Sequence, residues 1–401
     1  MNGQPALAIN PPAFLSDPAL APVLAALPEA RIAGGAVRDT LAGCPVADID
    51  LATPRPPDQV VAALAQAGIR AVPTGIAHGT VTAVSGGRGY EITTLRRDVR
   101  TDGRHAEVAF TADWRADAAR RDFTMNALSM TRDGAVFDYF GGIADLRAGI
   151  VRFVGDPATR IAEDCLRVLR FFRFHARYAG GPPDPAAAAA IRAGVPGLAR
   201  LSAERVWSEL ARILAVPDPR EAVALMAELG VLAAAIPEGA DPARLARIVA
   251  AGAPADPLLR LAALLTGDPA AFAARLRLST AERDRLLALH HAPLASPDAN
   301  DDALRRLLAD TGPAVLRDRT WLDGGTGPEW AALRARLATM PRPVFPLEGR
   351  DVLALGLPPG PLVGALLRAT RDWWLQGGCR ADPAACRAEL ARLAASRASP
   401  E

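Results

Sequence analysis

The chain has 401 residues, of which 50% are hydrophobic and 22% are charged, and its formal net charge is +2. This composition is typical of a folded globular protein and excludes a wholly disordered chain. The length indicates roughly two to four domains. The four cysteines are too few and too scattered for a disulfide scaffold, and none forms the CxxC pair of a zinc ribbon.

All 46 basic residues are arginine, because the sequence contains no lysine. Codon bias is sufficient to explain this, but it has a chemical consequence. Every cationic contact with a phosphate must be made by a guanidinium, which donates from a planar fork and stays charged. Since the net charge is close to zero, any surface that binds nucleic acid must be a local one.

The N-terminal residues lack the basic region and apolar core of a signal peptide. No uncharged apolar run reaches the length of about 18 residues that a membrane-spanning helix needs. We therefore expect a cytoplasmic protein with no membrane partner.

The pattern of the chain changes near residue 155. Up to about Val154, short β-like runs alternate with turns and one or two helices, whereas helical patterns separated by Pro, Gly and Asp breaks follow Asp156. This order predicts an α/β head followed by a long all-α body. The predicted strands are Arg31–Ala33, Ile49–Thr53, Thr80–Val84, Tyr90–Leu95 and Val136–Tyr139.

The run RIAGGAVRD at residues 31–39 predicts a strand, a tight turn at Gly34 and Gly35, and the start of a helix. Glycines in such a turn let backbone N–H groups approach a phosphate, and a helix N-terminus favours negative charge. Taken alone, a Gly-Gly turn before a helix is more often structural, and this one is neither GxGxxG nor a Walker motif.

The segment DIDLAT at residues 48–53 begins nine residues after Asp39. The two-residue period of a strand places Asp48 and Asp50 on one face and Ile49 and Leu51 on the other. Two neighbouring carboxylates repel each other unless they are solvated or share a divalent cation. A phosphate-binding turn beside such a pair is what two-metal nucleotidyl transfer requires.

A third carboxylate would complete the site. Glu91 lies between Tyr90 and Ile92 on a predicted strand. A surface glutamate on an edge strand is an equally good interpretation.

The run RRDFTMNAL at residues 120–128 places arginines directly beside an aspartate. From these adjacent positions, Arg121 can bond triphosphate oxygens while Asp122 bonds a ribose 2′-hydroxyl. The bond to the 2′-hydroxyl would make the site selective for ribonucleotides. An ordinary surface salt bridge is the alternative.

A helix is predicted over Asp156–Tyr178. Its apolar stripe is Ile161, Cys165, Val168, Leu169, Phe172 and Ala176. On the other side, Asp164 and Arg167 are three residues apart and therefore neighbours. They form either a solvated salt bridge or a fixed acceptor and guanidinium for a base edge. Core packing is the expected role of Phe171 and Phe174.

Five ordered motifs together resemble the class II tRNA nucleotidyltransferases, which are the CCA-adding enzymes, grouped with the bacterial poly(A) polymerases. These motifs are GGAVRD, DIDLAT, RRDFTMNAL, DYFGGIADL (138–146) and EDCLRVLRFFRF (163–174), and the resemblance extends more weakly through GLPPGPLVGALL (356–367). The chain most resembles the α-proteobacterial branch. The resemblance implies an α+β fold, with a small mixed-sheet head and an elongated all-α neck, body and tail.

The resemblance also implies a role for each matching residue. Catalysis and metal binding fall to Asp48 and Asp50, with Glu91 as the candidate third acid. The residues implied in nucleotide binding are Gly34, Gly35, Arg38, Arg121, Asp122, Asp164, Arg167, Arg170 and Arg173. Among them, Asp164 and Arg167 would read the Watson–Crick edge of CTP or ATP in place of a template.

The expected activity is addition or repair of the 3′-terminal CCA of tRNA from CTP and ATP, with Mg²⁺ as cofactor and release of pyrophosphate. A poly(A) polymerase and an enzyme that adds only CC are the alternatives. The expected domains are a head at 1–152, a neck at 153–215, a body at 216–320 and a tRNA-binding tail at 321–401. No protein partner is inferred.

The polar stretch from Arg96 to Ala106 is expected to be a loop between two strand-like runs. In similar enzymes this loop helps the switch from adding C to adding A. The tyrosine and Arg-Arg-Pro that are usual in the family are absent, and the sequence reads Asp102-Gly103-Arg104-His105.

Overall fold

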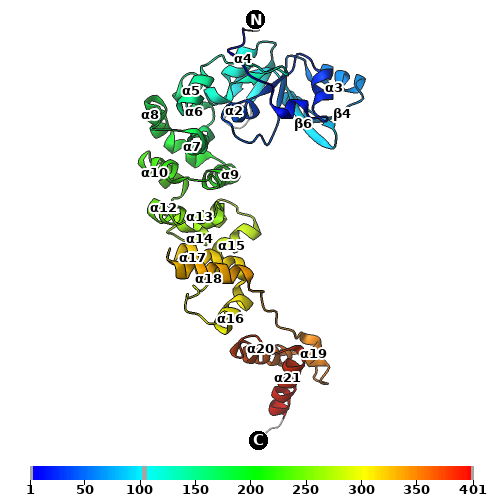
Figure 1. Cartoon of the computed structure of the whole chain (residues 1–401), viewed down its shortest axis with the longest axis vertical. Helices are drawn as coiled ribbons and strands as arrows, with labels where there is room; N and C mark the ends of the chain where they lie inside the picture. The colour runs from blue at the N-terminus through cyan, green and yellow to red at the C-terminus, as the bar shows by residue number, and fades with distance from the viewer. Residues whose placement is uncertain (1–2, 102–105, 399–401) are drawn as a thin grey trace. The chain divides into compact units, whose positions relative to one another are not determined.

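The computed structural model describes residues 3–101 and 106–398. The chain divides into two compact units, Met1–Pro237 and Glu238–Glu401 (Figure 1). The first unit contains a sheet and the helices that follow it, and the second is built from helices. The expected order of a mixed-sheet head followed by an all-α remainder is therefore confirmed.

The first unit has ten strands. They are β1 (Leu7–Ala8), β2 (Arg31–Ala33), β3 (Leu51–Thr53), β4 (Arg70–Gly75), β5 (Thr80–Ser85), β6 (Arg88–Thr94), β7 (Arg96–Thr101), β8 (Ala106–Phe110), β9 (Ser129–Met130) and β10 (Ala135–Phe137). The helices of the head are α1 (Ala21–Ala26), α2 (Gly35–Leu41), α3 (Pro57–Gln66), α4 (Trp114–Ala119) and α5 (Gly142–Ala148). All five predicted strands are present, although β3 begins two residues later than expected.

Eight of these strands form one mixed sheet in the order β1-β10-β9-β2-β3-β6-β5-β4. The neighbours β3 and β6 run parallel, with Leu51 opposite Ile92, and the other pairs are antiparallel. Because β2 and β6 flank β3, the end of β2 and the middle of β6 lie beside the start of β3.

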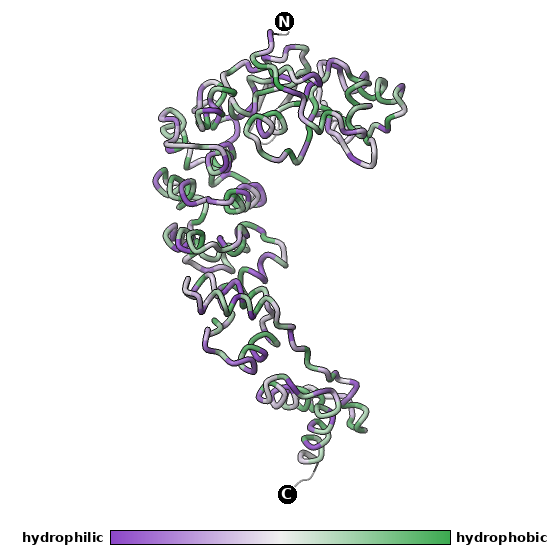
Figure 2. The backbone as a smooth tube through the Cα atoms, in the orientation of Figure 1, coloured by the Kyte–Doolittle hydropathy of each residue, from purple (hydrophilic) through white to green (hydrophobic). Residues whose placement is uncertain are grey.

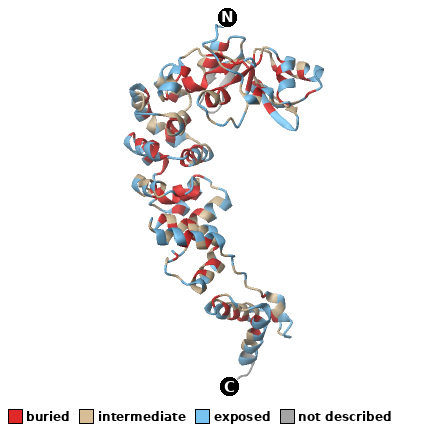
Figure 3. Ribbon diagram, in the orientation of Figure 1, coloured by how far each residue is buried: buried red, intermediate tan, exposed pale blue. Residues whose placement is uncertain are grey.

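Much of the sheet of the head is buried (Figure 3). Alternate residues of the central strands face two different layers. One face packs Ile32, Leu51 and Ile92 into the main core of the head, against α1, α2 and α3. The other face carries Ala33 and Ala52 into a smaller cluster. Since Asp50 and Glu91 alternate with Leu51 and Ile92, they belong to the second face.

The prediction of one long helix over Asp156–Tyr178 is wrong in one respect, because this segment forms two helices. They are α6 (Pro157–Glu163) and α7 (Leu166–Tyr178). Asp156 caps α6, and its side chain accepts from the Thr159 N–H. The break falls at Asp164, which has extended backbone angles and accepts from the Leu166 N–H at 3.1 Å. An aspartate that bonds a backbone N–H two residues later competes with helix continuation.

The predicted apolar stripe runs across this break. Ile161, Val168, Leu169 and Phe172 are buried, while Cys165 and Ala176 are only partly so. Phe171 and Phe174 are buried as expected for core residues. Phe171 stacks with Phe153 of the segment before α6, at 6.0 Å between ring centroids.

The prediction of a loop over Arg96–Ala106 is also wrong in part. The segment forms β7 and, together with β8, a separate two-stranded antiparallel ribbon. A polar stretch without apolar alternation gives little sign of a strand, because the backbone ladder itself is independent of side-chain polarity. Asp102, Gly103, Arg104 and His105 lie outside the described residues.

Helices α8 (Pro185–Gly194), α9 (Ala203–Leu214), α10 (Arg220–Glu228) and α11 (Val231–Ala235) complete the first unit. The second unit contains α12 (Pro242–Ala250), α13 (Pro257–Leu264), α14 (Pro269–Arg275), α15 (Thr280–His291), α16 (Asp301–Thr311), α17 (Pro313–Leu322), α18 (Pro328–Thr339), α19 (Gly349–Leu353), α20 (Pro361–Gln376) and α21 (Pro383–Ala398). Hydrophobic and hydrophilic residues alternate along these helices (Figure 2), as helices packed on one side require. Among the described residues, no helix combines the length and the hydropathy needed to cross a membrane.

Candidate active site

The turn between β2 and α2 carries the predicted glycines. Gly34 has a φ of +65°, and a Cβ placed on it would lie 2.7 Å from Nη1 of Arg121. A side chain at this position would therefore suffer both backbone strain and a clash. Gly35 is the first residue of α2, and a Cβ there would meet only ordinary contacts. The strict requirement for glycine thus applies to Gly34.

Asp50 lies next to this turn. Its carbonyl accepts from the Ala33 N–H at 2.9 Å, directly before Gly34. Asp48 and Asp50 are both exposed, whereas Ile49 and Leu51 pack on the main core. The predicted two-residue alternation therefore extends beyond the strand itself, into the segment that precedes β3.

Glu91 comes to the same place from β6. Leu51 pairs with Ile92 in the parallel register, so Asp50, directly before β3, and Glu91, within β6, lie side by side. Both residues line a small cavity of about 130 Å³ together with Arg121. Glu91 is not on a sheet edge, because β6 lies between β3 and β5.

The acidic neighbours alter the ionisation of Asp50. Partial burial raises the pKa of this carboxyl, Glu91 and Asp48 raise it further, and Arg121 opposes them. Like charges that share a site disfavour the ionised form, and a bound cation would reverse that effect.

The carboxylates suit a hard cation such as Mg²⁺. This ion usually takes one or two protein carboxylates and completes its octahedron with water and substrate phosphates. Within the part of the chain that the structure describes, no group of three or more His, Cys, Asp or Glu side chains has the arrangement of a metal site. The pair Asp48 and Asp50 therefore fits Mg²⁺ if the remaining ligands come from water and the nucleotide.

A larger pocket of about 600 Å³ opens beside the turn. It is lined by every residue that the sequence predicts for nucleotide binding: Gly34, Gly35, Arg38, Arg121, Asp122, Asp164, Arg167, Arg170 and Arg173. Asp50 is part of the same wall. Residues from the β2–α2 turn, α2, the 120–126 segment, the α6–α7 break and α7 thus converge on one cavity, which is hereafter the nucleotide pocket.

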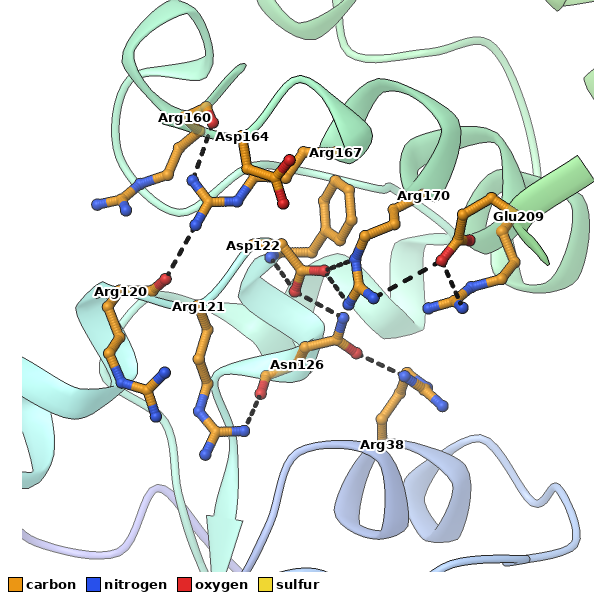
Figure 4. Close-up of polar contacts among 12 residues, drawn as sticks. Arg38, Arg120, Arg121, Asp122, Asn126, Arg160, Asp164, Arg167, Arg170 and Glu209 are labelled. Atoms are coloured by element: carbon orange, nitrogen blue, oxygen red, sulfur yellow. Dashed lines mark hydrogen bonds and ion pairs between the residues drawn. The ribbon is translucent and has the colours of Figure 1, made fainter. Parts of the chain in front are cut away.

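Asp122 is at the centre of a hydrogen-bond network in this pocket (Figure 4). Its Oδ1 accepts from the Phe123 N–H and from Nδ2 of Asn126, both at 2.9 Å. Its Oδ2 accepts from Nε of Arg170 at 2.7 Å and also from Nη2 of the same residue. Since a carboxylate has about four acceptor positions, these bonds already use the capacity of Asp122.

The network determines the charge of Asp122. Burial would favour the protonated acid, but the Arg170 guanidinium and the Asn126 and Phe123 donors outweigh it and lower the pKa of Asp122. The carboxylate therefore stays ionised at neutral pH and orients Arg170 and Asn126. A direct bond to a ribose hydroxyl would have to replace one of the bonds that Asp122 now makes.

Arg38 connects α2 with the rest of the pocket. Its Nη1 donates to Oδ1 of Asn126 at 2.5 Å, and its Nε and Nη2 donate to Oδ1 of Asp39 at 3.0 and 2.9 Å. The Tyr178 hydroxyl donates to the same Asp39 oxygen. The pKa of Tyr178 is raised to about 12, mainly by burial. Arg38 is thus held in place by residues of the head and of α7.

Asp164 and Arg167 do not form a salt bridge with each other. Asp164 instead accepts from Nη2 of Arg205, on α9, at 2.6 Å. Arg167 donates to the Arg160 carbonyl at 2.9 Å (Figure 4). It also donates to Glu163 at 2.5 Å. The helix break explains this, because the three-residue spacing makes neighbours only within one continuous helix. Each side chain is held separately at the pocket wall.

Arg170 and Arg173 meet a buried glutamate. Oε1 of Glu209, on α9, lies 3.2 Å from Nη1 of Arg173 and 3.9 Å from Nη1 of Arg170. Burial lowers the pKa of Arg173 to about 10, a value at which the side chain stays protonated at neutral pH. Glu209 therefore balances two arginines that would otherwise repel each other.

Several residues of this site were not predicted from the sequence. Arg96, Arg120, Asn126 and Arg205 line the nucleotide pocket, and Glu209 supports it from behind. Arg120 and Asn126 stand in the RRDFTMNAL run, so their motif was the available signal. Glu209 carries a signal only in its position, since it is an acidic residue among the apolar residues of an amphipathic helix.

The mixed-sheet head, the glycine turn and the paired aspartates define a nucleotidyltransferase, and comparisons with known proteins agree. The family described as the poly A polymerase head domain matches residues 30–152. A second family, described as the probable RNA and SrmB- binding site of polymerase A, matches residues 182–241.

Curated relatives and a solved structure that match longer parts of the chain identify the family more closely. CCA tRNA nucleotidyltransferase 1, mitochondrial, of Danio rerio is 37% identical over 364 residues, which are 86% of this chain and 83% of that protein. The CCA-adding enzyme of Anoxybacillus flavithermus is 41% identical over 207 residues, about half of each chain. The crystal structure of the Bacillus stearothermophilus CCA-adding enzyme in complex with CTP has a TM-score of 0.74 at 29% identity, over 94% of this chain and 98% of that one.

The chain therefore belongs to the family of CCA-adding enzymes and poly(A) polymerases, and it is a nucleotidyltransferase.

Proposed function

We propose that this enzyme adds or repairs the 3′-terminal CCA of tRNA, using CTP and ATP and releasing pyrophosphate. One observation carries the proposal. A nucleotide-sized pocket brings together arginines from α2, the 120–121 segment and α7, with Asp50 on the same wall. In the family, relatives named for CCA addition to tRNA match most of the chain. A solved relative with tRNA at 20% identity shares the fold.

The base would bind at the end of the pocket formed by Asp164 and Arg167. Asp164 offers an acceptor that Arg205 holds in place, and Arg167 offers a donor that Glu163 holds in place. An acceptor and a donor at fixed positions can pair with the edges of both cytosine and adenine, so protein groups would take the place of a template.

The triphosphate would bind along the arginine wall. Arg38, Arg121, Arg170 and Arg173 line the pocket, and the Gly34–Gly35 backbone leaves room for an anion. Guanidinium forks are the strongest side-chain donors to phosphate oxygens. We propose that Asp122 acts mainly by orienting Arg170 and Asn126.

Asp48 and Asp50 would hold Mg²⁺, and Glu91 is the candidate third carboxylate. When bound, Mg²⁺ would lower the pKa of the attacking 3′-hydroxyl and stabilise the leaving pyrophosphate. The carboxylates would place that hydroxyl in line with the α-phosphate, while Arg121, next to Asp50, would balance the charge. Four further points stay predictions. They are the number of bound ions, the cytoplasmic location, the bounds of the four domains and the resemblance to the α-proteobacterial branch.

The first test replaces the acids. Asp48→Asn and Asp50→Asn should each lower incorporation of CMP and AMP into tRNA by about a thousandfold, because the metal ligands lose their charge. Binding of tRNA, measured by filter retention, should change by less than about twofold, because neither residue is part of a basic surface. Asp58→Asn, at an exposed site in the first turn of α3, is the matched control.

Product lengths then identify the reaction. A tRNA that ends at the discriminator base is offered CTP alone, ATP alone, and both. Two additions with CTP and a third with both nucleotides support CCA addition. A stop after two additions would indicate a CC-adding enzyme, and a ladder of long A tails would indicate a poly(A) polymerase. Full activity of the Asp50→Asn variant would refute the proposed site.

A further inference from the structure

A third acid, Asp117, lines the small cavity that Asp50 and Glu91 share. We call this space the carboxylate cavity. Asp117 is a buried residue of α4, three residues before Arg120 and four before Arg121. Both arginines line the carboxylate cavity and also the nucleotide pocket. Asp117 therefore lies next to the proposed site, yet none of the roles described above uses it.

The carboxylate of Asp117 bonds both arginines. Its Oδ1 accepts from Nε and Nη2 of Arg120 at 2.9 and 2.8 Å, and its Oδ2 accepts from Nη2 of Arg121 at 3.3 Å. Oδ1 also accepts from the N–H of Arg96, the first residue of β7, at 3.2 Å. Since a carboxylate has about four acceptor positions, these bonds use the capacity of Asp117. Asp117 is therefore a partner of the arginines and not a further ligand for a cation.

The charge of Asp117 is preserved in spite of its burial. Burial would favour the protonated acid, but the charges of Arg121 and Arg120 and the hydrogen bonds from Arg120 and the Arg96 N–H outweigh it and lower the pKa of Asp117. Two neighbouring guanidiniums repel each other, and an ionised acid bonded to both offsets that repulsion. Asp117 therefore allows two arginines to stay close together.

Arg121 is held at both ends of its guanidinium. While Nη2 bonds Asp117, Nη1 donates to the Asn126 carbonyl at 3.3 Å. A guanidinium has five N–H donors, so these two bonds leave other donors for a phosphate. The side chain of Arg121 also keeps 23% of its surface exposed. Arg121 is therefore fixed in position and still able to bind a ligand.

The carboxylate cavity offers the same arginines a competing pair of acids. Burial and Glu91 raise the pKa of Asp50 and Arg121 opposes them, so the Arg121 and Asp50 charges interact. Within the part of the chain that the structure describes, however, neither arginine forms an ion pair with Asp50 or Glu91; both pair with Asp117. The oxygens of Asp50 and Glu91 therefore stay open to a cation, although guanidiniums line the same cavity.

We infer that Asp117 is a positioning residue, which keeps Arg120 and Arg121 directed to the nucleotide and away from the carboxylates proposed for Mg²⁺. Without the charge of Asp117, the guanidinium of Arg121 turns to Asp50 and Glu91, because these are the remaining acids of the carboxylate cavity. Arg121 is then lost to the triphosphate. This inference rests on the proposed function, in which Arg121 binds the triphosphate.

The first experiment measures the binding of CTP to the full chain by calorimetric titration, without catalysis. Asp117→Asn should raise the Kd of CTP about tenfold, because one charge-assisted bond to the triphosphate is lost. The Kd of cytidine, measured by displacement of CTP, should change by less than about twofold, because cytidine has no phosphate. Asp117→Glu keeps the charge, so its Kd for CTP should stay within about threefold of wild type. A damaged fold would instead weaken both ligands equally.

A double-mutant cycle shows whether Asp117 acts through Arg121. Arg121→Gln should raise the Kd of CTP about tenfold, and the double variant with Asp117→Asn should raise it by no more than about threefold beyond that. A rise of about a hundredfold in the double variant would overturn the inference, because the two residues would then act independently. An unchanged Kd of CTP in Asp117→Asn, or equal rises for CTP and cytidine, would also overturn it. If Asp117→Asn alone unfolds, the double variant, which loses the acid together with one arginine, is compared with Arg121→Gln and decides by the same criterion.

Asp318→Asn provides the matched control. Asp318 lies in the second unit, its side chain is 5% exposed like that of Asp117, and it pairs with Arg285 at 2.9 Å. Its replacement should leave the Kd values of CTP and cytidine at those of wild type. If the cycle gives the expected result but wild type adds no nucleotide to tRNA, the proposed function fails while this assignment stands. If tRNA is extended but Asp117→Asn binds CTP as wild type does, only the assignment fails.

Discussion

The arginines of the nucleotide pocket are held by partners from distant parts of the chain. Arg170 bonds Asp122, which is 48 residues earlier, and Arg38 bonds Asn126, which is 88 residues later. Each guanidinium keeps part of its five-donor fork for a ligand while the rest is fixed. The pocket is therefore oriented before a nucleotide binds, which lowers the entropy lost on binding.

Replacement of Asp122 tests this network. Asp122→Asn keeps the shape of the side chain but leaves Arg170 without its counter-charge in a largely buried place. We expect the free energy of unfolding to fall by about 2 kcal/mol, less than for a fully buried pair, because 31% of the Arg170 side chain is exposed. Urea unfolding measures the loss. Asp284→Asn, in an exposed pair with Arg283, should cause no measurable change.

The same pair predicts a pH dependence. Because the pKa of Asp122 is lowered in the folded state, its contribution to stability is complete above the unfolded pKa of about 4. This contribution is lost as the pH falls through the lower, folded-state pKa. The difference in unfolding free energy between wild type and Asp122→Asn should thus be constant from pH 7 to about 5 and shrink below about pH 4. A difference that stays constant down to pH 2 would show that Asp122 acts without its charge.

At the scale of elements, the site is built at points where regular structure stops. The turn between β2 and α2 presents Gly34, and the segment before β3 presents the aspartates. The break between α6 and α7 frees Asp164 and Arg167 from each other. A continuous helix there would have paired these two side chains and removed both from the pocket wall.

The Gly34 turn can be tested with two alanine substitutions. Gly34→Ala should lower kcat/KM by about tenfold or more, because the new Cβ displaces Arg121 and strains the backbone. Gly43 has a similar positive φ of +67°, and a Cβ added there would meet no atom within 4 Å. Gly43→Ala therefore adds backbone strain without displacing any side chain. Steady-state kinetics with CTP distinguish the two. Equal activity losses would mean that backbone strain alone, and not the contact with Arg121, is responsible.

At the scale of the whole molecule, the nucleotide pocket lies in the unit Met1–Pro237. The helices of Glu238–Glu401 form their own apolar clusters. The proposed site for the nucleotide and the chemistry therefore belongs to the first unit, and the second unit contains the tail at 321–401, for which the sequence predicts binding of tRNA.

A truncation after Pro237 tests this division. The fragment should keep a cooperative thermal transition, because its cores are complete. Its affinity for CTP should stay within about threefold of the full chain, while its affinity for tRNA should fall about tenfold or more through lost phosphate contacts. Calorimetric titration with each ligand provides the comparison. Unchanged tRNA affinity would remove the predicted role of the second unit.

The sequence by itself predicted which residues would share the proposed site. Spacing placed Asp48 and Asp50 on one side of a strand, and the motifs identified nine residues that line the nucleotide pocket, although not Arg96, Arg120 or Arg205. These are local properties, because alternation along a strand and the residues of a turn depend only on near neighbours in the chain.

The tertiary structure decided which partners hold these residues. The pairs Asp122–Arg170, Asp164–Arg205 and Arg173–Glu209 join segments that are 36 to 48 residues apart. The nucleotide pocket likewise exists only where the β2–α2 turn, the 120–126 segment and α7 meet. Packing of distant segments sets such contacts, and no local pattern encodes which charges it will bring together.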